Sequence, residues 1–156
     1  MSDPDFATFA AITRRLYEYA YGIDTRDWAL YRSIFADEVH MDFSSYSGDA
    51  GRTVTADDWV RGVQPLFEGL DATQHSLSNP LVEVDGDRAR CRMYMQAEHF
   101  LTHGQGDPSY AIGGYYDDQL IRTEAGWLIT GVTLNVLWHR GNRHIMSLAV
   151  QERHQR

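Results

Sequence analysis

The chain has 156 residues, with 14 basic and 22 acidic side chains, and every basic side chain is an arginine. The absence of lysine excludes Schiff-base, pyridoxal-phosphate and phosphate-loop chemistry. The net charge of −8 argues against a nucleic-acid partner, and the single Cys91 excludes an internal disulfide or a multi-cysteine metal site. Because no apolar run approaches about 18 residues, we expect one cytoplasmic domain over residues 1–156, outside any membrane.

The first third of the chain has the three- and four-residue periodicity of helices. Asp3 as a cap and Pro4 at the first helical position predict a first helix that ends near Gly22. Its apolar stripe consists of Phe6, Phe9, Ile12, Leu16 and Tyr19. A second helix, capped by Asp24 or Thr25, is predicted to bury Trp28, Tyr31, Ile34 and Phe35.

A short strand over 39–43 and a loop over 44–51 follow this pair of helices. Thr55 and Asp58 have the spacing of a capping box and predict a third helix, which Pro65 should shorten or kink. The order of helices before strands is typical of an α+β domain with a core over about 8–140 and an arm over 141–156.

From Thr73 onward the hydrophobic period changes to two, which predicts strands. We expect strands over 73–78 and 81–84, a hairpin turn at Asp85-Gly86, and long strands over 88–101, 110–123 and 127–138. The strand over 88–101 has one apolar face: Ala89, Cys91, Met93, Met95, Ala97, His99 and Leu101. Its other face mixes Arg88, Arg90, Arg92, Tyr94 and Glu98, which favours either a homo-oligomer interface (dimer or trimer) or a solvated face.

Two histidines are candidates for proton chemistry because they lie on inward strand faces. His99 lies between Ala97 and Leu101, as a core histidine or as an imidazole that lines a cavity. His75 shares a face with Thr73 and Leu77. The spacing of His99 and His103 permits a metal pair, but no third ligand has a diagnostic spacing, so we predict no metal site.

Several short motifs, taken in order, resemble the SnoaL-like proteins of the nuclear-transport-factor-2-like superfamily. They are Tyr17-Glu18-Tyr19-Ala20, Ile23-Asp24-Thr25-Arg26-Asp27-Trp28, Ala36-Asp37-Glu38-Val39, Thr73-Gln74-His75 with Asn79, Gly113-Gly114-Tyr115-Tyr116-Asp117, and Gly126-Trp127. The resemblance covers about residues 8 to 140. Among proteins of known activity, it points to scytalone dehydratase and hexachlorocyclohexane dehydrochlorinase.

The resemblance implies a cone-shaped α+β barrel, whose curved mixed or antiparallel sheet wraps around the N-terminal helices and encloses a pocket. It implies that Asp24 and His75 form a catalytic dyad and that His99 is a second catalytic histidine. Ile23 and Phe43 stand where the dehydratase has tyrosines that polarise a carbonyl, so Tyr46 or Tyr116 would have to replace them. The lysine of the dehydrochlorinase has no counterpart.

These residues predict a cofactor-free, dehydratase-like lyase that acts on a small cyclic or polyketide-like carbonyl compound. Asp24 would orient His75, which removes a proton next to the carbonyl, while His99 protonates the departing hydroxyl. The predicted substrate-binding residues are Tyr46, Tyr116, Trp28, Met93, Met95 and Leu101.

Three alternatives remain open at this point. The same dyad would serve a polyketide cyclase or an isomerase, because both reactions begin with removal of an acidic proton. A non-catalytic subunit like the β subunits of aromatic-ring dioxygenases would not need an inward His–Asp pair. A small-molecule binding module would hold its ligand without turnover.

Overall fold

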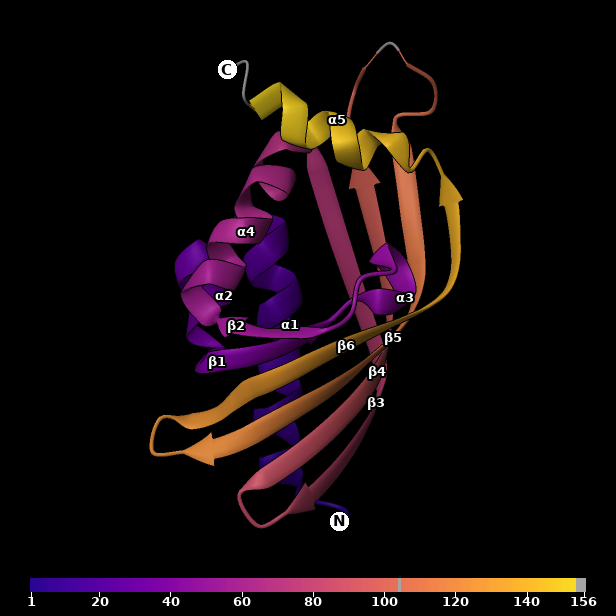
Figure 1. The fold of residues 1–156 in the computed structure, drawn as a ribbon. Coiled ribbons are helices and arrows are strands. Elements are labelled where there is room, and N and C mark those ends of the chain that lie inside the picture. The colour runs from indigo at the N-terminus through magenta and orange to yellow at the C-terminus, as the bar shows by residue number, and fades with distance from the viewer. Residues whose placement is uncertain (104, 154–156) are drawn as a thin grey trace.

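The computed structural model describes residues 1–103 and 105–153, apart from the side chains of 152 and 153, and consists of helices packed into the hollow of a curved sheet (Figure 1). In chain order the elements are α1 (Phe6–Thr25), α2 (Trp28–Ser33), β1 (Phe35–Asp42), α3 (Ser44–Ser47), β2 (Arg52–Thr55), α4 (Ala56–Gly69), β3 (Ala72–Asp85), β4 (Arg88–Phe100), β5 (Ser109–Thr123), β6 (Gly126–Gly141) and α5 (His144–Arg153).

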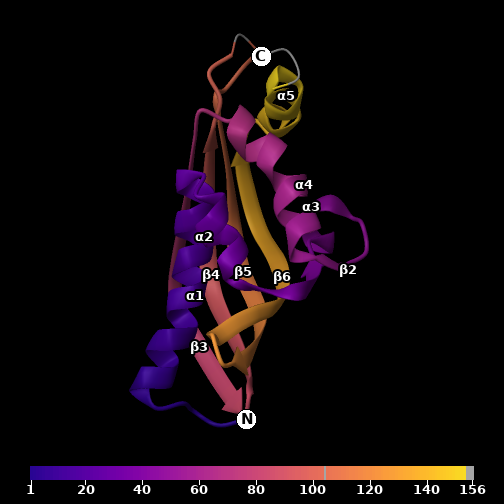
Figure 2. The ribbon, with the colours of Figure 1, turned by 90° about the vertical axis from the view of Figure 1, so that its left-hand side faces the viewer.

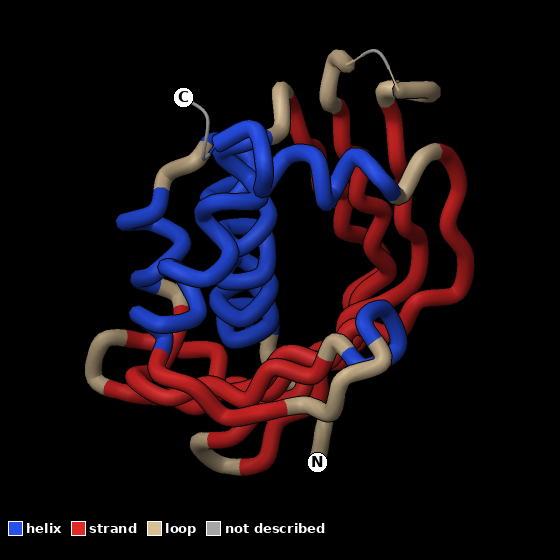
Figure 3. Tube along the Cα trace, turned by 45° about the horizontal axis from the view of Figure 1, so that its top comes forward, coloured by secondary structure: helices blue, strands red, loops and turns tan. Residues whose placement is uncertain are grey.

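The sheet has six strands in the order β2-β1-β6-β5-β4-β3. All neighbouring strands are antiparallel except β1 and β6, which run parallel, so the sheet is mixed. It curls around α1, α2 and α4 without closing, because β2 and β3 are its two edges (Figures 2 and 3). The predicted α+β class with helices inside a curved mixed sheet is confirmed, and the cone is open.

The helix boundaries differ from the predicted ones at three capping residues. Asp5 caps α1, since its carboxylate accepts the Thr8 backbone N–H at 2.7 Å, so the predicted cap at Asp3 is wrong. The helix continues beyond Gly22 to Thr25, where Arg26 ends it in the left-handed conformation at φ 58°. Asp27 caps α2, which places Asp24 inside the last turn of α1.

Thr55 is confirmed as the cap of α4, because its hydroxyl accepts the Asp58 backbone N–H at 3.1 Å and donates to the Asp58 carboxylate at 2.9 Å. Pro65 lies within α4 without ending it. The predicted loop over 44–51 contains the single turn α3. The strand predicted over 39–43 begins earlier, at Phe35, which therefore belongs to β1 and not to the second helix.

The predicted alternation of β4 is confirmed, with its odd-numbered residues from Ala89 to His99 buried. The hairpin at Asp85-Gly86 is also present, and Gly86 has the positive φ of 58° that such a turn requires. The two strands predicted before it are one strand, β3, whose pairing with β4 is interrupted between Ser78 and Leu81.

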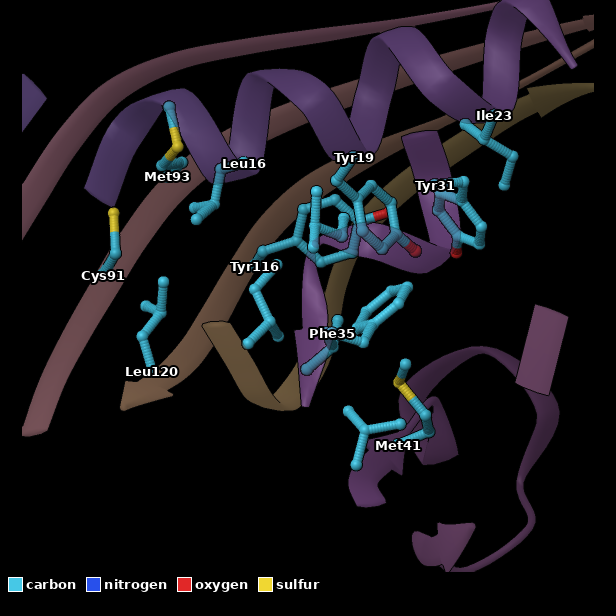
Figure 4. Close-up of a cluster of buried hydrophobic side chains, with 14 of the residues drawn as sticks. Leu16, Tyr19, Ile23, Tyr31, Phe35, Met41, Cys91, Met93, Tyr116 and Leu120 are labelled. Atoms are coloured by element: carbon cyan, nitrogen blue, oxygen red, sulfur yellow. The ribbon is translucent and has the colours of Figure 1, made fainter. Parts of the chain in front are cut away.

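Two apolar clusters fill the space between the helices and the sheet, and they lie at different positions along the strands. The larger one gathers the side chains of α1, α2 and the inward sheet face (Figure 4). The smaller cluster lies at the wide end and includes Leu70, Leu101, Tyr110, Ile112, Ile145, Leu148 and Ala149. The helix α5 therefore covers the wide end (Figure 1), while residues 154–156 of the predicted arm lie outside the described part of the chain.

Within the described residues, none of the helices is both long and apolar enough to cross a membrane.

Candidate active site

Asp24 is held at the junction of α1 and α4 by the residue that ends α1. The Arg26 guanidinium donates to the backbone carbonyl of Phe67 at 2.8 Å, to that of Leu70 at 3.2 Å and to that of Asp24 itself at 2.6 Å. These carbonyls are groups that a helix end leaves without an intrahelical partner. Arg26 thereby fixes the last turn of α1, and with it the Asp24 side chain, against the end of α4.

Asp24 and His75 form a hydrogen-bonded pair inside the cone. The Asp24 carboxylate oxygen Oδ1 lies 2.7 Å from His75 Nδ1 and also accepts the Thr73 hydroxyl at 2.8 Å. The other oxygen, Oδ2, accepts the His75 backbone N–H at 2.6 Å. Only 5% of the His75 side chain and 16% of the Asp24 side chain are exposed to solvent.

These contacts determine which nitrogen of His75 is free to act as a base. A carboxylate only accepts hydrogen bonds, so the proton of a neutral His75 ring sits on Nδ1 and leaves Nε2 unprotonated. Burial alone would raise the pKa of Asp24, but hydrogen bonds from His75 and Thr73, together with the His75 charge, bring it below its ordinary value. Asp24 is therefore an anion that orients His75.

His99 lies next to this pair, with its ring centroid 6.0 Å from that of His75. Its Nδ1 is 3.1 Å from the carbonyl oxygen of Tyr110, which places the proton of the neutral ring on Nδ1 and leaves Nε2 as an acceptor. Burial, and to a smaller extent the charge of His75, lowers the pKa of His99 to about 4. A neutral His99 with this tautomer presents an acceptor at Nε2, which favours a hydrogen-bonding role over the predicted role as the acid that protonates the leaving group.

A cavity of about 240 Å³ lies between the sheet and the helices, and His75 of the dyad lines it. His99 lines it too, and apolar and aromatic side chains make up the rest of its wall. The other lining residues are Tyr19, Ile23, Tyr31, Phe43, Tyr46, Trp59, Val63, Leu66, Phe67, Met95, Ala97, Ile112, Tyr116, Leu134 and Met146. The site thus combines an oriented imidazole with a mostly apolar cavity the size of a small ring compound.

The predicted substrate-binding residues divide into two groups. Tyr46, Tyr116 and Met95 line the cavity. Trp28, Met93 and Leu101 do not: the Trp28 indole donates to Glu68 at 3.0 Å, Met93 lies in the larger apolar cluster, and Leu101 lies in the cluster under α5. Alternation along a strand identifies the inward face, but not the height along the cone at which the cavity lies.

Side chains of α3, α4 and α5 lie at the wide end of the cavity. Tyr46, Leu66 and Met146 line the cavity and also an outer groove against α5. Arg143 holds Tyr46 in place, since its guanidinium donates to the Tyr46 carbonyl at 2.8 Å and lies 4.2 Å from the centre of the Tyr46 ring. A ligand that enters from this end passes these three side chains.

Sequence reasoning missed two tyrosines and a tryptophan of the cavity wall. Tyr19 and Tyr31 were expected as core residues of the first two helices, and Trp59 as part of the apolar side of the third. All three line the cavity, and the Trp59 indole N–H donates to the Tyr31 hydroxyl at 3.0 Å. Helical periodicity marks such residues as inward-facing and does not separate a packed interior from a cavity.

Among the described residues, no group of three or more His, Cys, Asp or Glu side chains could hold a metal ion. His103 Nδ1 accepts the Gln105 backbone N–H at 2.9 Å, whereas His99 Nδ1 faces the Tyr110 carbonyl.

Comparisons with known proteins agree with this fold. An uncharacterized protein of Mycobacterium tuberculosis is 29% identical over 118 residues, which are 76% of this chain and 78% of the relative. A protein of Pestalotiopsis microspora named a dehydratase is 23% identical over 135 residues, covering 81% of this chain and 85% of the relative.

Two solved structures are similar over most of their length. The Kfla4162 protein of Kribbella flavida has a TM-score of 0.86 and 28% identity, covering 90% of this chain and 97% of that one. The hexachlorocyclohexane dehydrochlorinase of Novosphingobium barchaimii has a TM-score of 0.71 and 19% identity, covering 88% and 91%. The family model described as a SnoaL-like domain matches residues 6–133. The chain therefore belongs to the SnoaL-like family.

Proposed function

We propose that the protein is a lyase of the dehydratase type that needs no cofactor and acts on a small cyclic or polyketide-like carbonyl compound. The observation that carries the proposal is the 2.7 Å contact between Asp24 and His75 Nδ1 at the wall of an apolar cavity. The similarity to a protein named a dehydratase supports the same class. The two histidines, the cavity and the family are each compatible with this reaction.

His75 is the general base of the proposed reaction. Its Nε2 removes a proton from the carbon next to the substrate carbonyl, and the Asp24 carboxylate stabilises the imidazolium that results. Asp24 acts as a positioning residue, because it holds the Nδ1–H tautomer and the ring orientation. The apolar cavity wall limits the access of water, so the proton transfer from substrate to imidazole takes place in a medium of low dielectric constant.

The second half of the reaction can use the same histidine. When the C–O bond at the neighbouring carbon breaks, its electron pair leaves with the hydroxyl group and the enolate electrons form the carbon–carbon double bond. The proton now on His75 Nε2 joins the hydroxyl to form water, which restores the starting imidazole. His99 Nε2 accepts a hydrogen bond from the hydroxyl and holds it beside His75, in place of the acid role predicted for it.

An isomerase is the second candidate, and the tautomer of His99 favours it. With no separate acid at His99, a proton taken by His75 can return to a different carbon of a conjugated substrate, which moves a double bond without loss of water. The non-catalytic subunit and the binding module predict no proton transfer at all, so a turnover experiment separates them from both enzymes.

The proposal is tested with 3-hydroxycyclohexanone and 3-hydroxy-1-tetralone, whose dehydration products absorb in the ultraviolet. The wild-type protein is expected to accelerate dehydration of at least one of them. His75→Ala and Asp24→Asn should reduce the rate by about 10²-fold or more, in line with general-base catalysis. His40→Ala, which removes an exposed histidine of β1, is the matched control. Turnover by His75→Ala at the wild-type rate would contradict the proposal.

The oligomeric state and the location in the cell remain predictions. The outer face of β4 presents Tyr94, which is 57% exposed, among arginines, and Leu137 of β6 lines a surface groove together with Tyr94. We propose this face as the contact between copies of the chain, in a dimer or trimer. A monomer mass in light scattering would contradict this proposal.

A further inference from the structure

The outer groove beside α5 continues the cavity toward the surface. The groove measures about 730 Å³ and shares three lining side chains with the cavity, those of Tyr46, Leu66 and Met146. The cavity, at about 240 Å³, has room for a ring, whereas the groove has room for a chain that the ring carries. A substrate that places its ring beside His75 and extends toward the wide end therefore reaches this groove.

The groove has a fixed wall, because α5 packs against the end of α4 (Figures 1 and 2). Ile145 and Ala149 of α5 are completely buried in the smaller apolar cluster. Gly69, the last residue of α4, permits this contact, since a Cβ at that position would collide with the Ala149 backbone carbonyl. The residues at the start of α5 are thereby held at the wide end of the cavity.

The groove is more polar than the cavity, and its charge is positive. Besides the three shared side chains, its lining consists of Arg143, His144, Ser147, Val150 and Gln151. No aspartate or glutamate is among the described residues that line the groove, and no arginine is among those that line the cavity. A ligand in the cavity therefore meets a guanidinium only where it extends into the groove.

The charge of Arg143 is directed toward the wide end of the cavity. The guanidinium donates to the Tyr46 carbonyl at 2.8 Å and lies 4.2 Å from the centre of the Tyr46 ring. It also acts on Tyr110, which is 1% exposed and whose hydroxyl has no hydrogen-bond partner among the described residues. Burial raises the pKa of Tyr110, and the Arg143 charge opposes this effect. The guanidinium therefore lies near the protein interior, where an anion would be partly shielded from water.

Arg143 makes no ion pair with a carboxylate of the described residues, in contrast to other arginines of this chain. Arg140, for example, pairs with Glu98 at 3.0 Å. The start of α5 does not supply a competing donor, because the His144 backbone N–H already donates to the Asn142 side chain at 3.1 Å. In a chain of net charge −8, Arg143 is thus a cation available for an anionic ligand.

We propose that Arg143 and the outer groove form a second binding site, for a carboxylate on a flexible chain, so that the substrate of this cavity is a ring compound with an acidic tail. The ring lies in the cavity beside His75, and the chain passes Tyr46, Leu66 and Met146. A guanidinium has five N–H donors, so donors remain for a carboxylate besides the one bound to Tyr46. The inference rests on the proposed function for the reaction at the ring, but binding of the tail does not require turnover.

The probes for this site are ω-phenylalkanoic acids of increasing chain length and the ω-phenylalkanols of the same lengths, titrated calorimetrically at pH 8, where the acids are anions. We expect the wild-type protein to bind at least one acid about five-fold more tightly than its alcohol, as expected for one ion pair near the surface. Arg143→Gln should bring the ratio of the two affinities close to one. Because the ratio compares two ligands in the same variant, a general change in the shape of the cavity cancels.

Two further variants separate charge from position. Arg143→Lys should keep part of the preference for the acid, since it keeps the charge but not the planar fork of donors. Arg140→Gln removes an exposed arginine that pairs with Glu98, and it is the matched control, which should show the wild-type preference.

The outcome distinguishes this site from the proposed function. Asp24→Asn should lose turnover and keep the preference for the acid, because Asp24 does not line the groove. Preference for the acid without turnover by the wild-type protein would overturn the lyase and leave the tail site in place. Equal affinities for acid and alcohol at every chain length, an unchanged preference in Arg143→Gln, or no binding of any probe by the wild-type protein would each overturn the tail site.

Discussion

Protonation of His99 should make the stability of the protein depend on pH between 4 and 6.5. The pKa of His99 falls from 6.5 to about 4 on folding, because of burial first and the neighbouring His75 charge second. In this window the unfolded chain binds a proton that the folded protein excludes, so stability rises with pH and is lost as the pH falls. The difference between a pKa of 6.5 and one of about 4 corresponds to about 3 kcal/mol of stability.

The assay is urea unfolding of wild type and His99→Phe at several pH values from 4 to 8. The variant loses the hydrogen bond to the Tyr110 carbonyl, which lowers its stability by a similar amount at every pH. Its free energy of unfolding should therefore change by about 3 kcal/mol less than that of wild type between pH 7 and pH 4. His144→Gln removes an exposed imidazole and should retain the wild-type pH dependence. Parallel curves for wild type and His99→Phe would refute the low pKa of His99.

Three further predictions concern other buried polar groups. Asp118 is buried with its Oδ1 unpartnered, and burial raises its pKa well above the ordinary value, so the free energy of unfolding should fall as the pH rises above about 4. In urea unfolding, Asp118→Asn should make that fall smaller. An unchanged pH dependence in the variant would contradict the raised pKa. Arg26→Ala should destabilise the protein by about 1–3 kcal/mol in thermal unfolding and slow turnover, because it frees the Phe67 and Leu70 carbonyls, whereas the exposed Arg61→Ala should not. Nitrogen-15 NMR of His75 at pH 8 should show that Nδ1 is protonated and Nε2 is not. A proton on Nε2 would contradict the assigned tautomer.

Strand faces and the His–Asp pairing could be anticipated from the chain, for different reasons. The inward face of β4 follows from strict alternation, a property of each strand by itself. Asp24 and His75 are 51 residues apart, and no periodicity brings them together. Their proximity was expected through the family resemblance alone.

The errors arise where tertiary contacts override local signals. Arg26 takes the left-handed conformation in place of a glycine because its guanidinium binds two backbone carbonyls at the end of α4, those of Phe67 and Leu70, besides that of Asp24 on α1. No local sequence pattern indicates that contact, so α1 was predicted to end at Gly22. The glycine instead allows α2 to pack closely against α1, because a Cβ at position 22 would lie 3.0 Å from the Tyr31 backbone nitrogen.

The most direct test of the central claim is solvent exchange at the carbon that His75 is proposed to deprotonate. Cyclohexanone and 1-tetralone are incubated with the protein in D₂O, and the signals of their α-protons are followed by NMR. This measurement isolates the step that the lyase, the isomerase and the cyclase share. Wild-type protein should exchange these protons faster than buffer does, and His75→Ala should not. Equal exchange by wild type and His75→Ala, or no acceleration for a ketone that the protein binds, would contradict the assignment of His75 as the base.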